Sequence, residues 1–243
     1  MELNNSRGSI PLYMQIKAIL VEKISAGEWA PGSVIPSEMQ LAAQLSVSHG
    51  TVRKAITELV ESNILLRRQG KGTFVAIHDD ARALFHFFHI ADDKGVKVLP
   101  ESRTLSCRRK RAPRLVASRL DITPGSTIIA IERVRSINKQ AAIAESIYLP
   151  SGTFGDFAGL RAAELPNTLY TFYENRFGVT IHKAEEQLRA IISNEQDASL
   201  LGLTPGAPLL EIERTAFSLA GTPVELRISR CNTGGFHYAN TII

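Results

Sequence analysis

Hydrophobic residues in the first part of the chain recur every three to four positions, which is the spacing of one face of a helix. Three such stretches follow one another, beginning at Pro11, Ser37 and Ser48. Ser37 and Ser48 are the expected N-caps of the second and third helices, while Gly27 and Asn63 are suited to helix ends. The residues expected to face inward are Leu12, Ile16, Ile19, Leu20, Ile24, Leu41, Ala42, Leu45, Val52, Ile56, Leu59 and Val60.

Two short apolar strands follow the third helix. They cover residues 64–68 and 73–76, and the residues between them, Gln69-Gly70-Lys71-Gly72, have the composition of a hairpin tip. Three helices followed by a hairpin predict a winged helix-turn-helix, a class of DNA-binding domain.

The outer face of the third helix is predicted to enter the major groove of DNA. Arg53 is the strongest candidate, because a guanidinium group can hold guanine O6 and N7 together. Ser48 and Thr51 offer hydroxyl groups to phosphates, and Gly50 lets the start of the helix approach the DNA backbone. The complete set of candidate DNA-binding residues is Ser37, Ser48, His49, Gly50, Thr51, Arg53, Lys54, Arg68, Gly70 and Lys71.

The second part of the chain contains an internal repeat. Residues 120–133 and 201–214 both carry a Thr-Pro-Gly turn followed by an apolar strand ending in Glu-Arg, and each is followed by a strand with a glutamate, Glu145 or Glu225. The repeat predicts a duplicated short helix, turn and β-hairpin. Between the copies, Asn167 and Thr168 are expected to cap a helix that ends at Gly178.

Consecutive hairpins favour antiparallel pairing, so we expect an α+β chain whose second domain has one antiparallel sheet with helices on one side. The predicted domains are residues 1–77 for DNA binding, 78–84 as a linker and 85–243 for the sheet domain.

Charged residues interrupt the apolar alternation of the predicted sheet. Arg133 and Arg135 share a strand face with Ile129 and Ile131, and Glu145 interrupts the next strand. Burying these charges is costly unless they are paired or bind a ligand. Two interpretations remain open, a structural set of ion pairs or a site where the two guanidinium groups hold a small anion.

Composition narrows the function classes. The chain has 243 residues, of which 44% are hydrophobic, and a net charge of +4, which permits a nucleic-acid partner. It has no apolar run long enough for a membrane span and no secretory signal at its start, so we expect a cytoplasmic protein. Cys107 and Cys231 lack the spacing of a metal or redox site and are expected to be buried free thiols. No metal, cofactor or catalytic residue is predicted. The basic run from Arg108 to Arg111, followed by Arg114, is either a solvated strand end or a second contact to phosphates.

Residues 10–76 resemble the DNA-binding domain of the GntR family of bacterial transcription regulators. The resemblance rests on PLYMQI, PGSVIPSE, LAAQLSVSHGTVRKAITELV and GKGTFVA. It implies a ligand-responsive regulator, most often a repressor, that binds a palindromic operator in double-stranded DNA as a homodimer. Two positions that usually hold arginine in this family are Met39 and His49 here, so the family's usual operator sequence does not carry over.

Residues 85–243 resemble the UTRA effector-binding domain of the HutC subfamily, which has a chorismate-lyase-like fold. The matching segments are Pro100–Arg103, Ile131–Arg135, Glu145–Pro150, Thr168–Tyr170, Phe177–Gly178 and Gly221–Glu225. The resemblance implies a small-molecule effector, an organic acid or a phosphorylated metabolite. The implied effector-binding residues are Phe88, His89, Arg133, Arg135, Glu145, Thr168, Tyr170 and Glu225. Cys231 stands where relatives that respond to sugar phosphates have tyrosine, so an amino-sugar phosphate is not implied.

Two other function classes compete with a regulator. A chorismate-lyase-like enzyme fused to a DNA-binding module is one alternative, although the histidines are scattered without a partnered nucleophile. A constitutive DNA-binding protein that responds to no metabolite is the other.

Overall fold

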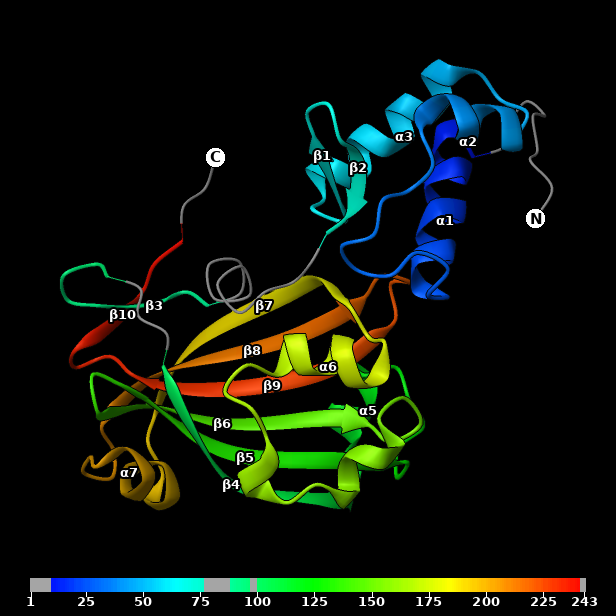
Figure 1. Cartoon of the computed structure of the whole chain (residues 1–243). Helices are drawn as coiled ribbons and strands as arrows, with labels where there is room; N and C mark the ends of the chain where they lie inside the picture. The colour runs from blue at the N-terminus through cyan, green and yellow to red at the C-terminus, as the bar shows by residue number, and fades with distance from the viewer. Residues whose placement is uncertain (1–9, 77–87, 97–99, 241–243) are drawn as a thin grey trace.

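The computed structural model describes residues 10–76, 88–96 and 100–240. A helical domain stands at one end of a larger domain built on a curved sheet (Figure 1). The predicted linker, residues 78–84, lies outside the described residues, as do the predicted domain boundaries on either side of it.

The first helix, α1, covers Leu12–Ser25 and begins one residue after Pro11. Its buried residues lie on one face, four positions apart, as the apolar spacing predicted: Ile16, Leu20 and Ile24. Gly27 follows the helix with a φ of 76°, a left-handed conformation that glycine adopts without strain.

The second and third helices, α2 (Glu38–Gln44) and α3 (His49–Glu61), form the helix-turn-helix. Ser37 accepts a hydrogen bond from the backbone of Gln40, whose side chain in turn accepts one from the backbone of Ser37, so the predicted capping box is present. Ser48 caps α3 with a single hydrogen bond, in which its side chain accepts the backbone N–H of Thr51.

The hairpin that follows pairs β1 (Leu65–Arg68) with β2 (Gly72–Val75). Together with the three helices it encloses one hydrophobic core, against which Trp29 also packs. The predicted winged helix-turn-helix is therefore present in full.

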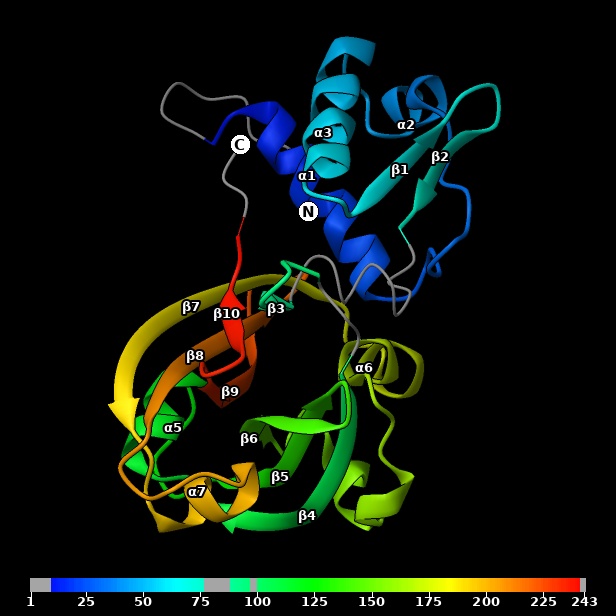
Figure 2. The ribbon, with the colours of Figure 1, turned by 90° about the vertical axis from the view of Figure 1, so that its left-hand side faces the viewer.

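The larger domain contains a six-stranded antiparallel sheet with strands in the order β4-β5-β6-β9-β8-β7. Figure 2 shows how strongly this sheet curves. The strands are β4 (Glu101–Arg111), β5 (Thr127–Ile137), β6 (Gln140–Pro150), β7 (Ile181–Ile192), β8 (Pro208–Ser218) and β9 (Pro223–Asn232). A separate two-stranded sheet pairs β3 (Ile90–Asp92) with β10 (Phe236–Tyr238).

The internal repeat folds as predicted, as a helix, a turn and a hairpin in each copy. The helices are α5 (Arg114–Arg119) and α7 (Glu195–Leu201), and they lead into the hairpins β5–β6 and β8–β9. Gly125 and Gly206, in the two Thr-Pro-Gly turns, have φ values of 82° and 85°. The two hairpins join through β6 and β9 at the centre of the sheet, which brings equivalent residues of the two copies together.

The prediction of helices on one side of the sheet is wrong. Ile129 and Ile131 pack in the cluster that contains α6 (Leu169–Phe177), whereas Ile128, whose side chain points to the opposite face of β5, packs with α5. A strand that is apolar on both faces must be packed against other elements on both sides of the sheet. β5 and β6 are such strands, because most of their residues are buried.

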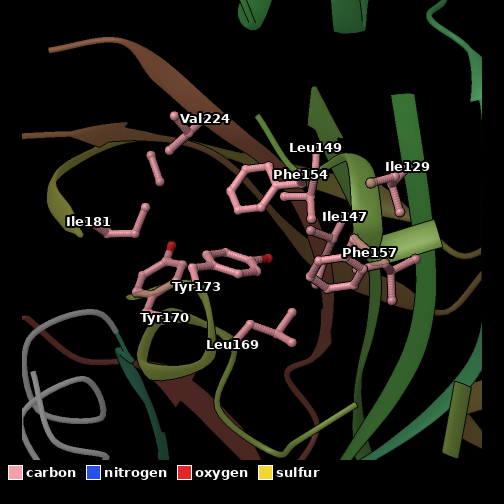
Figure 3. Close-up of a cluster of buried hydrophobic side chains, with 12 residues drawn as sticks. Ile129, Ile147, Leu149, Phe154, Phe157, Leu169, Tyr170, Tyr173, Ile181 and Val224 are labelled. Atoms are coloured by element: carbon pink, nitrogen blue, oxygen red, sulfur yellow. The ribbon is translucent and has the colours of Figure 1, made fainter. Parts of the chain in front are cut away.

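Helix α6 is held to the sheet by the largest apolar cluster of the domain (Figure 3). Leu169, Tyr170 and Tyr173 from α6 meet Phe154 and Phe157, which belong to the segment containing the short 3-10 helices η1 (Gly155–Gly159) and η2 (Ala162–Glu164). The predicted helix end at Gly178 is confirmed by its φ of 65°. Thr168 occupies the N-cap position, but its side chain makes no capping hydrogen bond, so that part of the prediction is wrong.

The two domains meet at the turn between β8 and β9, which lies beneath the end of α1 in Figure 1. Leu219 from this turn packs against the core of the DNA-binding domain. Beside it is a crevice with a volume of about 250 Å³, lined by the last turn of α1, the β8–β9 turn and the segment Gly178–Thr180 after α6. No helix within the described ranges is long and apolar enough to cross a membrane.

Candidate DNA-binding surface and effector pocket

The start of α3 is organised by hydroxyl groups. Ser48 Oγ and Thr51 Oγ1 are 2.8 Å apart, and Ser48 Oγ also accepts the backbone N–H of Thr51. Gly50 has room for a side chain, since the nearest atom to an added Cβ is 3.9 Å away. The protein therefore does not itself require glycine at this position, and a close approach of DNA remains its predicted role.

Glu38 connects the recognition helix to the wing. Its two carboxylate oxygens lie 3.0 Å from His49 Nε2 and 2.8 Å from Arg67 Nη2. Arg67 also donates to Thr57 Oγ1 at 3.2 Å. These contacts tie the first residue of α3 to strand β1 through one residue of α2, a connection between distant segments that sequence spacing does not show.

The other predicted DNA-binding residues differ in how they are held. Arg53 is exposed and makes no hydrogen bond or ion pair within the described part of the chain. Arg68 stacks over the Phe74 ring at 4.9 Å, and Lys54 Nζ lies 3.8 Å over the Tyr13 ring of α1. At the wing tip, Gly70 has a φ of 70° and Lys71 is exposed. Ser37 is engaged in its capping box.

The second site is a pocket in the sheet domain on the face that carries α6. Seven of the eight predicted effector-binding residues line it, and the eighth, Glu225, lies just behind it. The lining residues are Phe88, His89, Ile90, Arg133, Arg135, Ile143, Glu145, Asn167, Thr168, Leu169, Tyr170, Ile212, Arg214, Arg227, Ser229, Cys231 and Tyr238.

Glu145 is the centre of a buried charge network. The register of the sheet places it opposite Arg133 on β5 and Ser229 on β9, and its carboxylate lies 2.5 Å from Arg133 Nε. Arg135 and Arg227 each approach it to 3.6 Å. Burial by itself would raise the pKa of Glu145, but the three arginines outweigh burial and lower it from 4.5.

Among the three arginines around Glu145, Arg135 has the positive charge that is least balanced by nearby carboxylates. Its Nε donates to Ser102 Oγ at 3.1 Å, and its guanidinium group lies 5.1 Å from the Phe88 ring centroid. Burial, reinforced by neighbouring arginines and opposed by Glu145, lowers the pKa of Arg135 to about 9, which still leaves it charged at neutral pH. A bound anion would stabilise this charge.

Glu225 lies in the second copy of the repeat and connects α6 to the sheet. It accepts hydrogen bonds from the hydroxyl groups of Tyr170 at 3.1 Å and Tyr173 at 2.7 Å, and from Arg227 at 3.0 and 2.9 Å. Burial and the negative charge of Glu225 raise the pKa of Tyr170 to about 12, so both tyrosine hydroxyls are donors at neutral pH.

Sequence reasoning missed several polar residues of this network, among them Arg214, Glu186, Arg227 and Tyr238. Arg214 is 2.5 Å from Glu186, whose other oxygen accepts the Tyr238 hydroxyl at 2.6 Å, and Arg227 bridges Glu145 and Glu225. Arg214 was detectable, because it occupies the position in the second repeat that Arg133 occupies in the first. Glu186, Arg227 and Tyr238 had no comparable signal.

Metal binding is not indicated by the described residues, in which no three of His, Cys, Asp and Glu gather as a metal site would require. Both cysteines are free thiols. Cys231 is buried, as expected, and burial raises its pKa, whereas Cys107 is only partly buried. The basic end of β4 lies on the side of the sheet domain away from the DNA-binding domain (Figure 2).

The two sites together define a class of protein, a winged-helix DNA-binding protein with a candidate small-molecule pocket in a separate domain. The description "Bacterial regulatory proteins, gntR family" matches residues 12–75, and "UTRA domain" matches residues 97–237. The chain belongs to the GntR family of bacterial transcriptional regulators and has the UTRA effector domain of its HutC-type members.

Named relatives extend over nearly the whole chain. The HTH-type transcriptional repressor NagR of Bacillus subtilis is 31% identical over 91% of this chain and 90% of its own length. The mannosyl-D-glycerate transport/metabolism system repressor MngR of Escherichia coli is 29% identical, covering 95% of each chain. The crystal structure of a ligand-binding domain of a GntR-family regulator from Bordetella bronchiseptica is 34% identical, with a TM-score of 0.60 over 65% of this chain and 98% of that one. These likenesses identify a transcriptional regulator and not a chorismate-lyase-like enzyme.

Proposed function

We propose that this protein is a repressor that binds a palindromic operator as a homodimer in the cytoplasm and is controlled by a small anionic metabolite. The observation that carries the effector part of this proposal is the charge balance of the pocket. Arg133, Arg135, Arg214 and Arg227 are matched by three glutamates among the described residues, Glu145, Glu186 and Glu225, which leaves one positive charge in a largely buried site. A carboxylate or phosphate would neutralise it.

The character of the pocket further supports an organic acid. Its apolar wall, which includes Phe88, Ile143 and Ile212, suits a carbon skeleton, while the arginines suit an anionic end. Mannosyl-D-glycerate, for which MngR is named, is itself a sugar joined to a carboxylic acid.

The DNA-binding part of the proposal rests on α3 and the wing. Arg53 is exposed and unpaired within the described residues, as a base-reading residue of a major-groove helix should be. Arg68 stacks on Phe74 of the wing and Lys71 is exposed at its tip, which supports a role for both in contacting phosphates or a minor groove. One such domain reads only a few base pairs, so two copies on two half-sites are expected.

Regulation requires that the effector change the DNA-binding domain. The turn between β8 and β9 supports such coupling, because Leu219 packs on the DNA-binding core while Glu225, a few residues further along, holds α6 beside the pocket. An effector that binds one orientation of the two domains more tightly would shift the population toward it.

The effector assignment is tested by thermal-shift screening of D-glycerate, L-histidine and glucose 6-phosphate against the full chain. We expect at least one of these compounds, each of which carries a carboxylate or phosphate group, to raise the Tm, and the rise to disappear in Arg135→Met, which removes the weakly compensated charge and keeps a long side chain. Arg189→Met is the matched control, because Arg189 is nearly half exposed and does not line the pocket. A Tm rise that persists unchanged in Arg135→Met would rule out the arginine site.

The DNA assignment is tested with an operator selected from random duplexes. Arg53→Ala should lower the affinity by about 10- to 100-fold, because a bidentate contact to guanine is lost. Light scattering at micromolar concentration should give the mass of a dimer. A monomer, or an Arg53→Ala variant with unchanged affinity and sequence preference, would refute this part of the proposal.

A further inference from the structure

Two strands form the edges of the six-stranded sheet, β4 at one side and β7 at the other (Figures 1 and 2). Within the described part of the chain, each pairs with one neighbouring strand, so the backbone N–H and C=O groups of its other side are open. Proteins usually protect such an edge with charged side chains, because an unprotected edge pairs readily with another chain.

The edge strand β4 is protected in this way. It carries five positively charged residues and one negatively charged residue, and four of the positive residues are consecutive and exposed, Arg108–Arg111. Two copies of β4 laid side by side would bring these positive charges together, which is unfavourable. This edge is therefore unsuited to pairing with a second copy of the chain.

The second half of β7 has the opposite character. Gln187, Leu188, Arg189 and Ala190 are all exposed, and Leu188, Ala190 and Ile192 share one face because strand side chains alternate. Leu188 is 45% exposed and Ile192 is 73% exposed. Of the large hydrophobic side chains exposed in the described part of the sheet domain, only these two lie on a strand. An apolar stripe on an open sheet edge marks a site of contact with another chain.

The charges of β7 do not oppose contact between two copies. The strand has two positively and two negatively charged residues, so its net charge is zero. Arg189, the charged residue of the second half, lies 3.3 Å from Glu213 on β8 and so brings no unbalanced positive charge to the edge. The end of β7 also points away from the DNA-binding domain (Figure 2).

We infer that two copies of this chain join through the second halves of their β7 strands, which pair in antiparallel fashion and make the two sheets continuous. The inference rests on the proposed homodimer and makes it narrower by naming the surface. A contact of this kind uses the same patch of both copies around a twofold axis. It satisfies the open backbone groups and removes the apolar stripe from water.

The hydrophobic pattern also selects a register. With the twofold axis at Ala190, Leu188 of each copy lies opposite Ile192 of the other, and the two Ala190 residues face each other. The overlap is then residues 188–192. It leaves clear the first half of β7, where Glu186 accepts the Tyr238 hydroxyl at 2.6 Å.

Light scattering of the full chain at micromolar concentration tests the surface. The double substitution Leu188→Lys and Ile192→Lys sets like charges opposite each other, and it should raise the dissociation constant of the dimer by about 10-fold or more. Both positions are exposed, so the far-UV circular dichroism should not change. Leu115→Lys is the matched control, because Leu115 is an exposed hydrophobic residue on α5, away from the sheet edge, and its dimer should persist.

Cysteine cross-linking tests the register without weakening the contact. Directly opposite residues of antiparallel strands have Cα atoms about 4.5–5.5 Å apart, within the range of a disulfide. Ala190→Cys should therefore give a covalent dimer under mild oxidation. The wild type, whose thiols are Cys107 and Cys231, and Lys110→Cys on β4 should not.

The outcomes separate this inference from the proposed function. A dimer that persists in the double lysine variant, or that cross-links through Lys110→Cys and not through Ala190→Cys, would overturn the β7 interface and leave the homodimer standing. A wild-type protein that is a monomer would refute both.

Discussion

Replacing Glu145 by glutamine removes the carboxylate that three buried arginines share. Glu145 is 3% exposed, and its oxygens lie 2.5 Å from Arg133 and 3.6 Å from both Arg135 and Arg227. Glutamine has nearly the same shape, so the change is mainly one of charge. Breaking a buried ion pair by removing one partner costs about 3–5 kcal/mol, because the remaining charge stays buried without compensation.

The assay is urea unfolding followed by far-UV circular dichroism, which reports the secondary structure of both domains. With a denaturant slope of about 2 kcal/mol per molar urea, the midpoint should fall by about 1.5–2.5 M. The only tryptophan, Trp29, packs in the DNA-binding domain, so its fluorescence follows that domain separately. Glu185→Gln is the control, since the Glu185–Lys183 pair is more than half exposed and should contribute about 0–1 kcal/mol.

The pH dependence of the free energy of unfolding gives a second, independent test of the role of Glu145. Because the pKa of Glu145 is lower in the folded protein than its ordinary 4.5, its stabilising effect is complete above that value and is lost as the pH falls toward the folded pKa. The stability difference between wild type and Glu145→Gln should be constant from pH 6 to 8 and shrink by about 1.4 kcal/mol per pH unit below 4.5. An unchanged urea midpoint, or a difference that stays constant down to pH 3, would refute the ion-pair reasoning.

Three further predictions concern other parts of the molecule. Leu20→Ala, at a fully buried position of α1, should destabilise the DNA-binding domain by about 2–5 kcal/mol in Trp29 fluorescence, and a loss below 1 kcal/mol would contradict the packing described. Ser48→Ala should cost about 1 kcal/mol by removing the cap of α3, and Ser48→Gly only a few tenths; equal losses would argue against capping as the cause. Replacing the arginines and lysine at residues 108–111 by glutamine should leave the salt dependence of operator binding unchanged, because this end of β4 faces away from the DNA-binding domain; a flatter slope in gel-shift titrations would show that the run touches DNA.

The sequence by itself determined the local elements of this protein. Helix spacing, the caps at Ser37 and Ser48, and the glycine-rich wing tip depend on residues close together in the chain, so the winged helix-turn-helix could be predicted element by element. The internal repeat is equally visible, and it correctly marked two hairpins that each carry a glutamate. Strand alternation also placed Arg133 and Arg135 on one face of β5.

Only the tertiary structure decided which charges meet. Pairing of β6 with β9 joins strands about 80 residues apart, and it is this register that sets Glu145 opposite Ser229 and within reach of Arg227. The link from Glu38 to both His49 and Arg67, and the cover on both faces of the sheet, likewise depend on contacts between distant segments.

The pocket likewise depends partly on local sequence and partly on tertiary structure. Alternation could mark charges that point inward, but whether such a charge is neutralised or left over depends on every strand and helix that surrounds it. The surplus positive charge became visible only once the two repeats and α6 were assembled, because it is a property of the completed pocket and of no single segment.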